Sequence, residues 1–246
     1  KTCYFYKPCA YLDFVDSCSK IPFWVYKKPD PCGAGAVFNA TLVACICKPG
    51  WTGFDCSTAP TSCNDLLTPK QYPVGYYWVD IKNNDGTISI LYCEVIITGY
   101  RYHVFRNNGL VSHNKTYADY VKGYKIDESN FWIGLNNIYR YSLIYRNLQF
   151  KMDAVLENDV VMAYWQNTGV RTDGPTNLYN LNFSGTFSSF SAPVYSVSIT
   201  NCLFSGLTPF STWDNDHDGS PSNLAAQAGS GWYFGSSLSC NPLGQL

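Results

Sequence analysis

The spacing of cysteines constrains this chain most. Seven of its eleven cysteines fall before residue 57, and four fall after it. A segment so rich in cysteine is held by cross-links, whereas the remaining residues are numerous enough to bury a hydrophobic core. We therefore expect a cysteine-containing segment at 1–31, a small disulfide-rich module at 32–56, a linker at 57–62 and a large domain at 63–246.

The cysteines also indicate that the protein folds in an oxidising compartment. Disulfides persist in oxidising environments, and the sequons that begin at Asn39, Asn114 and Asn182 are acceptors for glycosylation on the secretory route. We expect a secreted, extracellular glycoprotein that carries glycans at these three asparagines.

Charge and composition exclude two kinds of partner. Charged residues make up 14% of the chain, the net charge is −1, and the longest basic run is Lys27-Lys28. Nucleic-acid binding requires a basic patch, so we do not expect it. The uncharged stretch at 174–213 is interrupted by Ser, Asn, Thr, Gly and Pro, so we expect no membrane span there.

Motifs of catalysis are missing from the sequence. It contains no Gly-x-Ser-x-Gly, no His-Glu-x-x-His and no glycine-rich phosphate loop. Of its three histidines, we expect His103 and His113 on the surface of a strand or loop rather than as catalytic bases. We therefore do not expect an enzyme.

An acidic run at residues 209–219 (PFSTWDNDHDG) is the strongest candidate site. Asp214, Asp216 and Asp218 alternate with other residues. Three like charges so close repel one another unless a cation gathers them, and Ca²⁺ takes about six to eight oxygen ligands. We expect a bound Ca²⁺, and the alternative is a solvated acidic turn.

An EF-hand cannot account for this run. The twelfth position counted from Asp214 is Ala225, where an EF-hand needs a bidentate Glu, and Pro221-Ser222 lies where a helix should begin. We expect a different calcium loop, in which aspartate side chains are joined by backbone carbonyls and water.

Periodicity in the large domain predicts an α+β fold with antiparallel strands and long loops. The predicted strands are 75–81, 87–93 and 147–152, the predicted helices are 117–124 and 129–138, and an Asp-Gly turn joins the first two strands. Cys93 ends its strand where it can bridge back to Cys63.

Residues 45–56 (CICKPGWTGFDC) resemble the C-terminal half of an EGF-like module. A zinc site is not expected, because no second pair of thiolates or histidines has suitable spacing. Upstream the pattern is degenerate, since residues 37–39 lack the module's third cysteine.

Two pairings are open for this module. If the first and third half-cystines are lost together, the resemblance implies Cys32–Cys45 and Cys47–Cys56. Alternatively, Cys9, Cys18 and Cys32 are the first three cysteines of the module. Either account leaves one N-terminal cysteine over, and we expect it to bridge two chains, with Cys3 as the candidate.

Several blocks of the large domain resemble, in order, the fibrinogen C-terminal (fibrinogen-related) domain. They are Cys63 with Leu66, Gly75 with Tyr77, and residues 92–94, 114–124 (NKTYADYVKGY), 131–135 (FWIGL), 148–153, 163–164, 209–219 and 229–233 (GSGWY). The last two blocks are similar to the family's calcium loop and its Gly-Trp-Trp run. The resemblance extends from Cys63 to the end and implies the family's α+β fold with antiparallel sheets and short helices.

The resemblance implies a ligand set for Ca²⁺. It assigns the side chains of Asp216 and Asp218 and the backbone carbonyls of Ser220 and Ser222. Asp214 corresponds to a nearby aspartate that is not a principal ligand in the family, so spacing favours Asp214 as a ligand more than the resemblance does.

We expect that one family disulfide is replaced by another. It would need cysteines at Leu224 and Ser237, and both are absent. Cys202 and Cys240 are then each other's available partner in this domain. Their bond would close a loop of about 38 residues and contribute roughly 3 to 4 kcal/mol.

The family's recognition pocket lies beside the calcium loop, where lectin-like members hold acetylated sugars and fibrinogen holds a peptide. Its characteristic histidine is Leu238 here, and Gln227 remains at a pocket position beside Ala228 instead of an acidic residue. Trp232, Tyr233 and Phe234 could form an aromatic stacking wall, and the alternative is that they pack in the core.

These features predict a calcium-binding recognition or adhesion protein that binds a glycan or glycoprotein. The EGF-like segment is expected to act as a spacer and to support a homo-oligomer with disulfides between chains. The alternative is a structural matrix, fibre or adhesive protein that uses the fold as a building block, which the 20 tyrosines and the spare cysteine favour.

Overall fold

The computed structural model describes the chain at residues 32–39, 41, 44–53, 55–67, 72–145, 148–155, 161–191, 208–238 and 240–245. Contacts divide the chain into two units, residues 1–103 and residues 104–246. The segment 1–31 with Cys3, Cys9 and Cys18 lies outside the described residues, as does Cys202.

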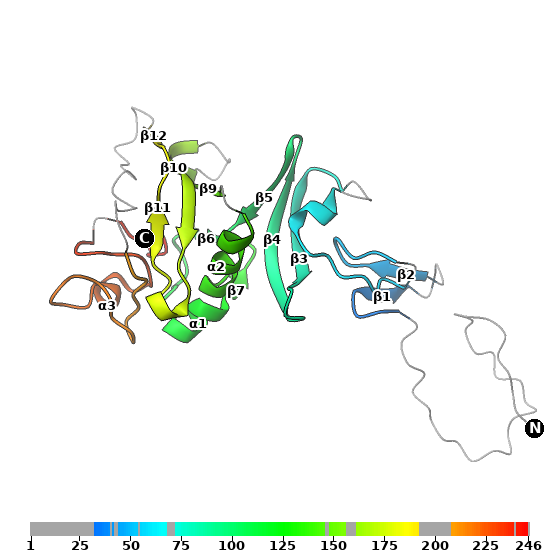
Figure 1. The fold of residues 1–246 in the computed structure, drawn as a ribbon, viewed down its shortest axis with the longest axis horizontal. Coiled ribbons are helices and arrows are strands. Elements are labelled where there is room, and N and C mark those ends of the chain that lie inside the picture. The colour runs from blue at the N-terminus through cyan, green and yellow to red at the C-terminus, as the bar shows by residue number, and fades with distance from the viewer. Residues whose placement is uncertain are drawn as a thin grey trace, which may run out of the picture. The chain divides into compact units, whose positions relative to one another are not determined.

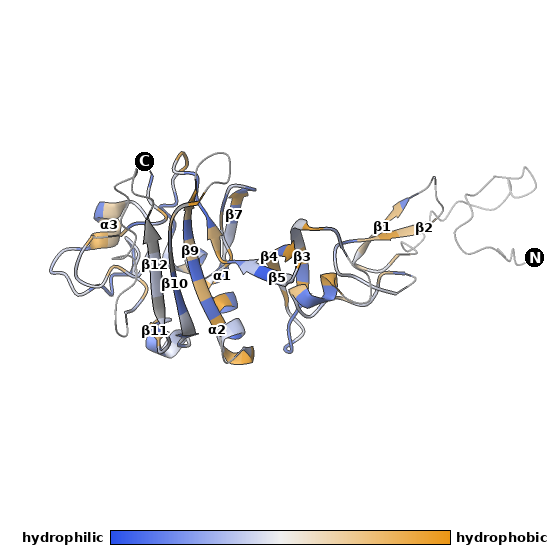
Figure 2. Cartoon of the chain, turned by 90° about the horizontal axis from the view of Figure 1, so that it is seen from above, coloured by the Kyte–Doolittle hydropathy of each residue, from blue (hydrophilic) through white to orange (hydrophobic). Residues whose placement is uncertain are grey.

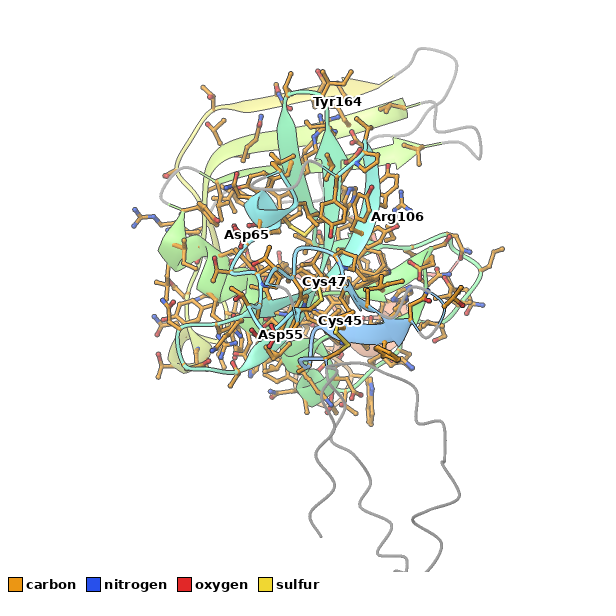
Figure 3. All side chains as sticks on the ribbon, turned by 90° about the vertical axis from the view of Figure 1, so that its right-hand side faces the viewer. Cys45, Cys47, Asp55, Asp65, Arg106 and Tyr164 are labelled. Atoms are coloured by element: carbon orange, nitrogen blue, oxygen red, sulfur yellow. A yellow bond between two sulfur atoms is a disulfide. The ribbon has the colours of Figure 1, made fainter. Side chains whose placement is uncertain are left out.

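The first element that the structure describes in the first unit is a two-stranded antiparallel sheet. Its strands are β1 (Ala36–Asn39) and β2 (Ala44–Cys47), and β2 carries Cys45 and Cys47, labelled in Figure 3. Disulfides join Cys32 to Cys45 and Cys47 to Cys56, the pairs of the first account above. Two bonds close short loops around this small sheet and restrict the unfolded chain, so little hydrophobic core is needed.

A three-stranded antiparallel sheet completes the first unit. It consists of β3 (Gly75–Lys82), β4 (Ile88–Ile96) and β5 (Gly99–His103) in the order β3-β4-β5, after the 3₁₀ helix η2 (Cys63–Leu66). Alternate side chains Val79, Ile81 and Leu91 are buried on one face. The predicted strands and turn are therefore present, and Cys63 and Cys93 form a disulfide.

The small cysteine-rich sheet and the three-stranded sheet share the first unit because they are bonded to each other. The ammonium of Lys48 lies 2.9 Å from a carboxylate oxygen of Asp80, and the amide of Lys82 donates to the carbonyl of Pro60 at 2.7 Å. Residues 57–62 thus carry ordered contacts to the sheet that follows them.

The second unit contains two further antiparallel sheets. One has the order β6 (Phe105–Arg106), β8 (Asn130–Trp132), β7 (Tyr124–Asp127). In the other, β10 (Val161–Thr172) pairs with β9 (Leu148–Val155) along one edge and with β12 (Phe187–Ser191) and β11 (Leu181–Phe183) along the opposite edge (Figure 1). β9 alternates between hydrophobic and polar residues, as expected of a strand with one buried face (Figure 2).

The helices of the second unit are short. They are α1 (Tyr117–Lys122), α2 (Leu135–Ile144), α3 (Leu224–Ala228) and the 3₁₀ helix η3 (Pro175–Asn177). Antiparallel sheets with short helices confirm the predicted α+β class. None of the helices in the described ranges is long and apolar enough to cross a bilayer.

One helix prediction is wrong. Residues 129–138 do not form one helix, because Asn130–Trp132 is the middle strand β8 and the helix begins at Leu135. Phe131 and Trp132 are buried between β6 and β7. Gly134 has φ 101°, which no residue inside an α-helix adopts, so the chain turns there before α2.

The core of the second unit is aromatic. Tyr120, Trp132, Phe210 and Trp232 are almost completely buried and pack with ring centroids 4.9–6.3 Å apart. The indole of Trp132 donates to the carbonyl of Tyr120 at 2.9 Å, so its polar atom stays satisfied in the core. Side chains from α1, β8 and two later loops are thereby fixed against one another.

His113 does not lie on the surface, which corrects the sequence prediction. It is fully buried, and its Nδ1 lies 2.9 Å from the hydroxyl of Tyr124. Its carbonyl accepts a hydrogen bond from the hydroxyl of Tyr120 at 2.7 Å. Burial lowers the pKa of the His113 imidazole below its ordinary value of 6.5, with Lys115 acting in the same direction and Asn130 and Asp127 opposing it.

We expect the buried imidazole to make the fold acid-sensitive. Above the unfolded pKa both states hold a neutral His113, but below it the unfolded state takes up a proton more readily, so stability falls as pH falls. A His113→Asn variant should lose less stability than wild type between about pH 7.5 and about pH 5.5 in urea titrations. Tyr124→Phe removes the same hydrogen bond but keeps the imidazole, so it should keep the wild-type pH slope; equal slopes for all three proteins would contradict the prediction.

Candidate calcium and recognition site

The acidic loop is anchored at both ends to the core. The amide of Ser211 donates to the carbonyl of Trp232 at 3.0 Å, and the amide of Trp232 donates back at 3.1 Å. Further along, the amide of Gly219 donates to the carbonyl of Gly235. Because Phe210 is fully buried, the loop leaves the core at a fixed place.

The first turn of the loop places Asp214 toward α1. Thr212 and Asn215 exchange backbone hydrogen bonds around the tip residues Trp213 and Asp214. Oδ1 of Asp214 accepts from the hydroxyl of Thr212 at 2.7 Å and from the backbone amide of Tyr117 at 2.9 Å. This carboxylate therefore bonds to a helix that is 97 residues away in the sequence.

Asp216 and Asp218 form successive turns of the loop. Oδ1 of Asp216 accepts from the amide of Asp218 at 3.1 Å, and Oδ1 of Asp218 accepts from the amide of Ser220 at 2.9 Å. Oδ2 of Asp218 accepts from the amide of Leu224, the first residue of α3, at 2.8 Å. The first two bonds stabilise turns within the loop, and the third satisfies a backbone donor in the first turn of α3.

The donor set left to a cation consists of hard oxygens. Asp216 is exposed, and each carboxylate oxygen of Asp216 and Asp218 that accepts one hydrogen bond keeps a further lone pair. The carbonyl oxygens of Ser220 and Ser222 accept no hydrogen bond from the described residues. Carboxylate and carbonyl oxygens are the ligands that Ca²⁺ prefers, so the chemistry of these four residues fits the ion.

The three aspartates do not gather around one point. Across the described ranges, no three side chains of His, Cys, Asp or Glu are grouped as metal ligands. A calcium site in this loop thus depends on backbone carbonyls and water as well as on side chains.

The three aromatic candidates for a stacking wall lie in the core. Trp232, Tyr233 and Phe234 are 1%, 3% and 0% exposed, so their rings have no face open to a ligand. Burial raises the pKa of the Tyr233 hydroxyl far above its ordinary value of 10.0, and it remains protonated at neutral pH. Their arrangement matches the alternative of core packing.

Three further residues of the second unit have exposed side chains. Gln227 is exposed, with its side-chain amide donating to the hydroxyl of Ser222 at 2.9 Å, and Leu238 at the family's histidine position is 43% exposed. Trp213, which the sequence did not single out, is 48% exposed at the tip of the first turn. Asn223 links Trp213 to Gln227. Its side-chain amide donates to the backbone carbonyl of Trp213 at 3.2 Å, and its backbone carbonyl accepts from the backbone amide of Gln227 at 3.3 Å.

The structure also locates the remaining predicted residues. Asn114 and Asn182 are exposed and Asn39 is half-buried, so the first two offer accessible amides for glycosylation. Cys240 is disulfide-bonded, but the predicted partner, Cys202, lies outside the described residues. Glycosylation at these sites stays a prediction.

The chain belongs to the fibrinogen C-terminal domain family. The family model described as "Fibrinogen beta and gamma chains, C-terminal globular domain" matches residues 59–246. Membership agrees with the expectation of a recognition domain without enzymatic activity.

Two curated relatives show how far the similarity extends. Human (Homo sapiens) Ficolin-3 is 28% identical over 189 residues, which cover 76% of this chain and 59% of Ficolin-3. Rat (Rattus norvegicus) Tenascin-R is 26% identical over 186 residues, which cover 74% of this chain and 13% of Tenascin-R. The chain thus spans about six-tenths of one relative and a small part of the other.

Solved structures share the fold. The lamprey fibrin D-dimer in complex with the peptide Gly-His-Arg-Pro-amide superimposes with a TM-score of 0.61 at 17% identity, covering 76% of this chain and 61% of that one. The fibrinogen-like globe domain of human ANGPTL2 gives a TM-score of 0.58 at 19% identity, covering 72% and 77%. At this identity, the likeness establishes the fold alone.

The hydrogen bonds of Asp218 predict that its removal lowers the stability of the fold even without calcium. With a chelator present, Asp218→Ala should lower the free energy of unfolding by about 1 to 2 kcal/mol, because the amides of Ser220 and Leu224 lose a charged acceptor. Asp216→Ala, which loses a single bond in an exposed turn, should cost less. Urea titrations of both variants would test this order, and equal costs would show that the capping bonds of Asp218 do not contribute.

Proposed function

We propose that this protein is an extracellular recognition or adhesion protein whose fibrinogen-like domain binds a glycan or glycoprotein next to a calcium-supported loop. The observation that carries the proposal is the acidic loop itself, which is anchored to the core at Ser211 and Gly219 and retains oxygen donors for a cation. Family membership and the disulfides support an extracellular recognition role.

Calcium would be held by the carboxylates of Asp216 and Asp218 and the carbonyls of Ser220 and Ser222. The ion would supply positive charge that offsets the repulsion between the two carboxylates. The loop would then hold Trp213 and Gln227 in one arrangement, because Asn223 bonds to both.

The exposed surface beside the loop suits a sugar better than the buried aromatic run does. Trp213 offers an accessible aromatic face, and Gln227 offers an amide that can donate and accept. Leu238 replaces the histidine that the resemblance places in the pocket, so recognition would rest on stacking and amide contacts instead.

A structural role in matrix, fibre or glue is the second candidate. Eleven cysteines cannot all pair within one chain, and an unpaired cysteine in a secreted protein commonly forms a bond between chains. Light scattering distinguishes the two roles: self-association into large assemblies would favour the structural role, and a strict monomer would argue against it.

We expect calcium to raise thermal stability, since an ion that binds only the folded loop stabilises it by mass action, by about 2.7 kcal/mol at 100 times its dissociation constant. Scanning calorimetry should show a lower melting temperature after chelation. Asp216→Ala should melt alike with and without calcium, while Asp173→Ala, outside the loop, should retain the calcium response. A calcium response that survives in Asp216→Ala would place the ion elsewhere.

Glycan binding should depend on the same loop. On a glycan array, wild type should bind in calcium and bind more weakly after chelation. Trp213→Ala should remove binding without altering the melting temperature in calcium, because its side chain is exposed. Absence of binding under both conditions would reject the glycan ligand.

A further inference from the structure

The outermost aspartate of the acidic loop has a different set of partners from the other two. Asp216 and Asp218 accept from amides of the loop and of the adjoining helix α3, whereas Asp214 accepts from helix α1. We propose that Asp214 is a positioning residue that couples calcium binding to α1 through its bond to Tyr117. This inference rests on the calcium site proposed above.

The geometry at Asp214 disfavours direct ligation through the oxygen that faces the protein. Oδ1 accepts two hydrogen bonds, from the Thr212 hydroxyl and the Tyr117 amide, which together use both of its lone pairs. The hydrogens of both donors occupy the positions around Oδ1 that a cation would need. Ligation of Ca²⁺ by Oδ1 would require both bonds to break.

Tyr117 contacts the loop a second time through its ring. The ring lies edge-on to the ring of His217, with centroids 5.5 Å apart. His217 stands between Asp216 and Asp218 and is held by the hydroxyl of Ser211 and the carbonyl of Phe210. The first residue of α1 therefore touches the loop both at Asp214 and between the two proposed ligands.

A second residue of α1, Tyr120, bonds to the core segment that holds the start of the loop. The hydroxyl of Tyr120 accepts from the amide of Gly231 at 2.9 Å and donates to the carbonyl of His113 at 2.7 Å. Gly231 precedes Trp232, which pairs with Ser211 at the start of the loop. The acidic loop, α1 and the segment at 231 thus form a closed set of hydrogen-bonded neighbours.

The consequence is a coupling between the ion and α1. If opening of α1 also releases the loop, calcium must suppress that opening, and at 100 times the dissociation constant the suppression approaches about 100-fold. Asp214 is the side chain of the loop that accepts a hydrogen bond from α1, so its removal should leave calcium binding in place and weaken the coupling of α1 to the ion.

Asp119 provides a matched control. Its carboxylate also accepts bonds at the start of α1, from the amide and hydroxyl of Thr116, but it does not belong to the loop. Asp119→Ala should lower the stability of α1 to a similar degree as Asp214→Ala without disconnecting α1 from calcium.

The experiment measures amide hydrogen exchange of residues 117–122 and calorimetric calcium binding on the full chain, with and without calcium. In wild type and in Asp119→Ala, calcium should slow exchange in α1, with the suppression approaching about 100-fold when calcium is at 100 times its dissociation constant. In Asp214→Ala, calcium should still bind but should slow exchange in α1 clearly less than it does in wild type.

Three outcomes overturn the inference in distinguishable ways. If Asp214→Ala abolishes calcium binding, Asp214 is a ligand and the proposed calcium site stands. If Asp214→Ala binds calcium and α1 is still protected as in wild type, the coupling does not pass through Asp214. If wild type binds no calcium, the proposed site and the coupling both fail.

Discussion

The packing of Phe210 against Tyr120 and next to Trp232 is the constraint on which the rest of the second unit depends. Gly231 approaches these rings so closely that a Cβ there would lie 2.7 Å from the Tyr120 ring and 2.8 Å from the Phe210 ring. A glycine is therefore required at this position, and its amide can reach the Tyr120 hydroxyl. Close packing fixes where the chain enters and leaves the acidic loop, so the loop is positioned by the core and not by its own sequence.

Backbone amides donate hydrogen bonds to the carboxylates of the acidic loop even without a bound ion. Asp214, Asp216 and Asp218 each accept at least one backbone amide, so the run is folded into successive turns instead of being splayed by repulsion. The carbonyl groups of Ser220 and Ser222 remain without a hydrogen-bond donor in the described part of the chain. The same bonds that order the loop thus leave oxygens for a hard cation.

Much of the fold could be read from local signals. Alternation of side chains predicted β3, β4 and β9, and the Asp85-Gly86 turn predicted the hairpin of β3 and β4. These patterns depend on neighbours within a few residues. The helix predicted at 129–138 failed because burial of Phe131 and Trp132 between two strands outweighs local helical preference. The sequence placed His113 wrongly for a related reason. Its imidazole can be buried because the hydroxyl of Tyr124 bonds to Nδ1, and sequence spacing does not reveal such a partner.

The sequence by itself determined the family, the α+β class, the Cys63–Cys93 pair and the place of the acidic run along the chain. Each of these depends on the type and spacing of residues close together in the chain. Only the tertiary structure decided that Trp232, Tyr233 and Phe234 are core residues, that Trp213 is exposed, and that Asp214 bonds to α1. The physical reason is that burial and long-range hydrogen bonds are properties of the packed core, in which residues 97 positions apart become direct neighbours.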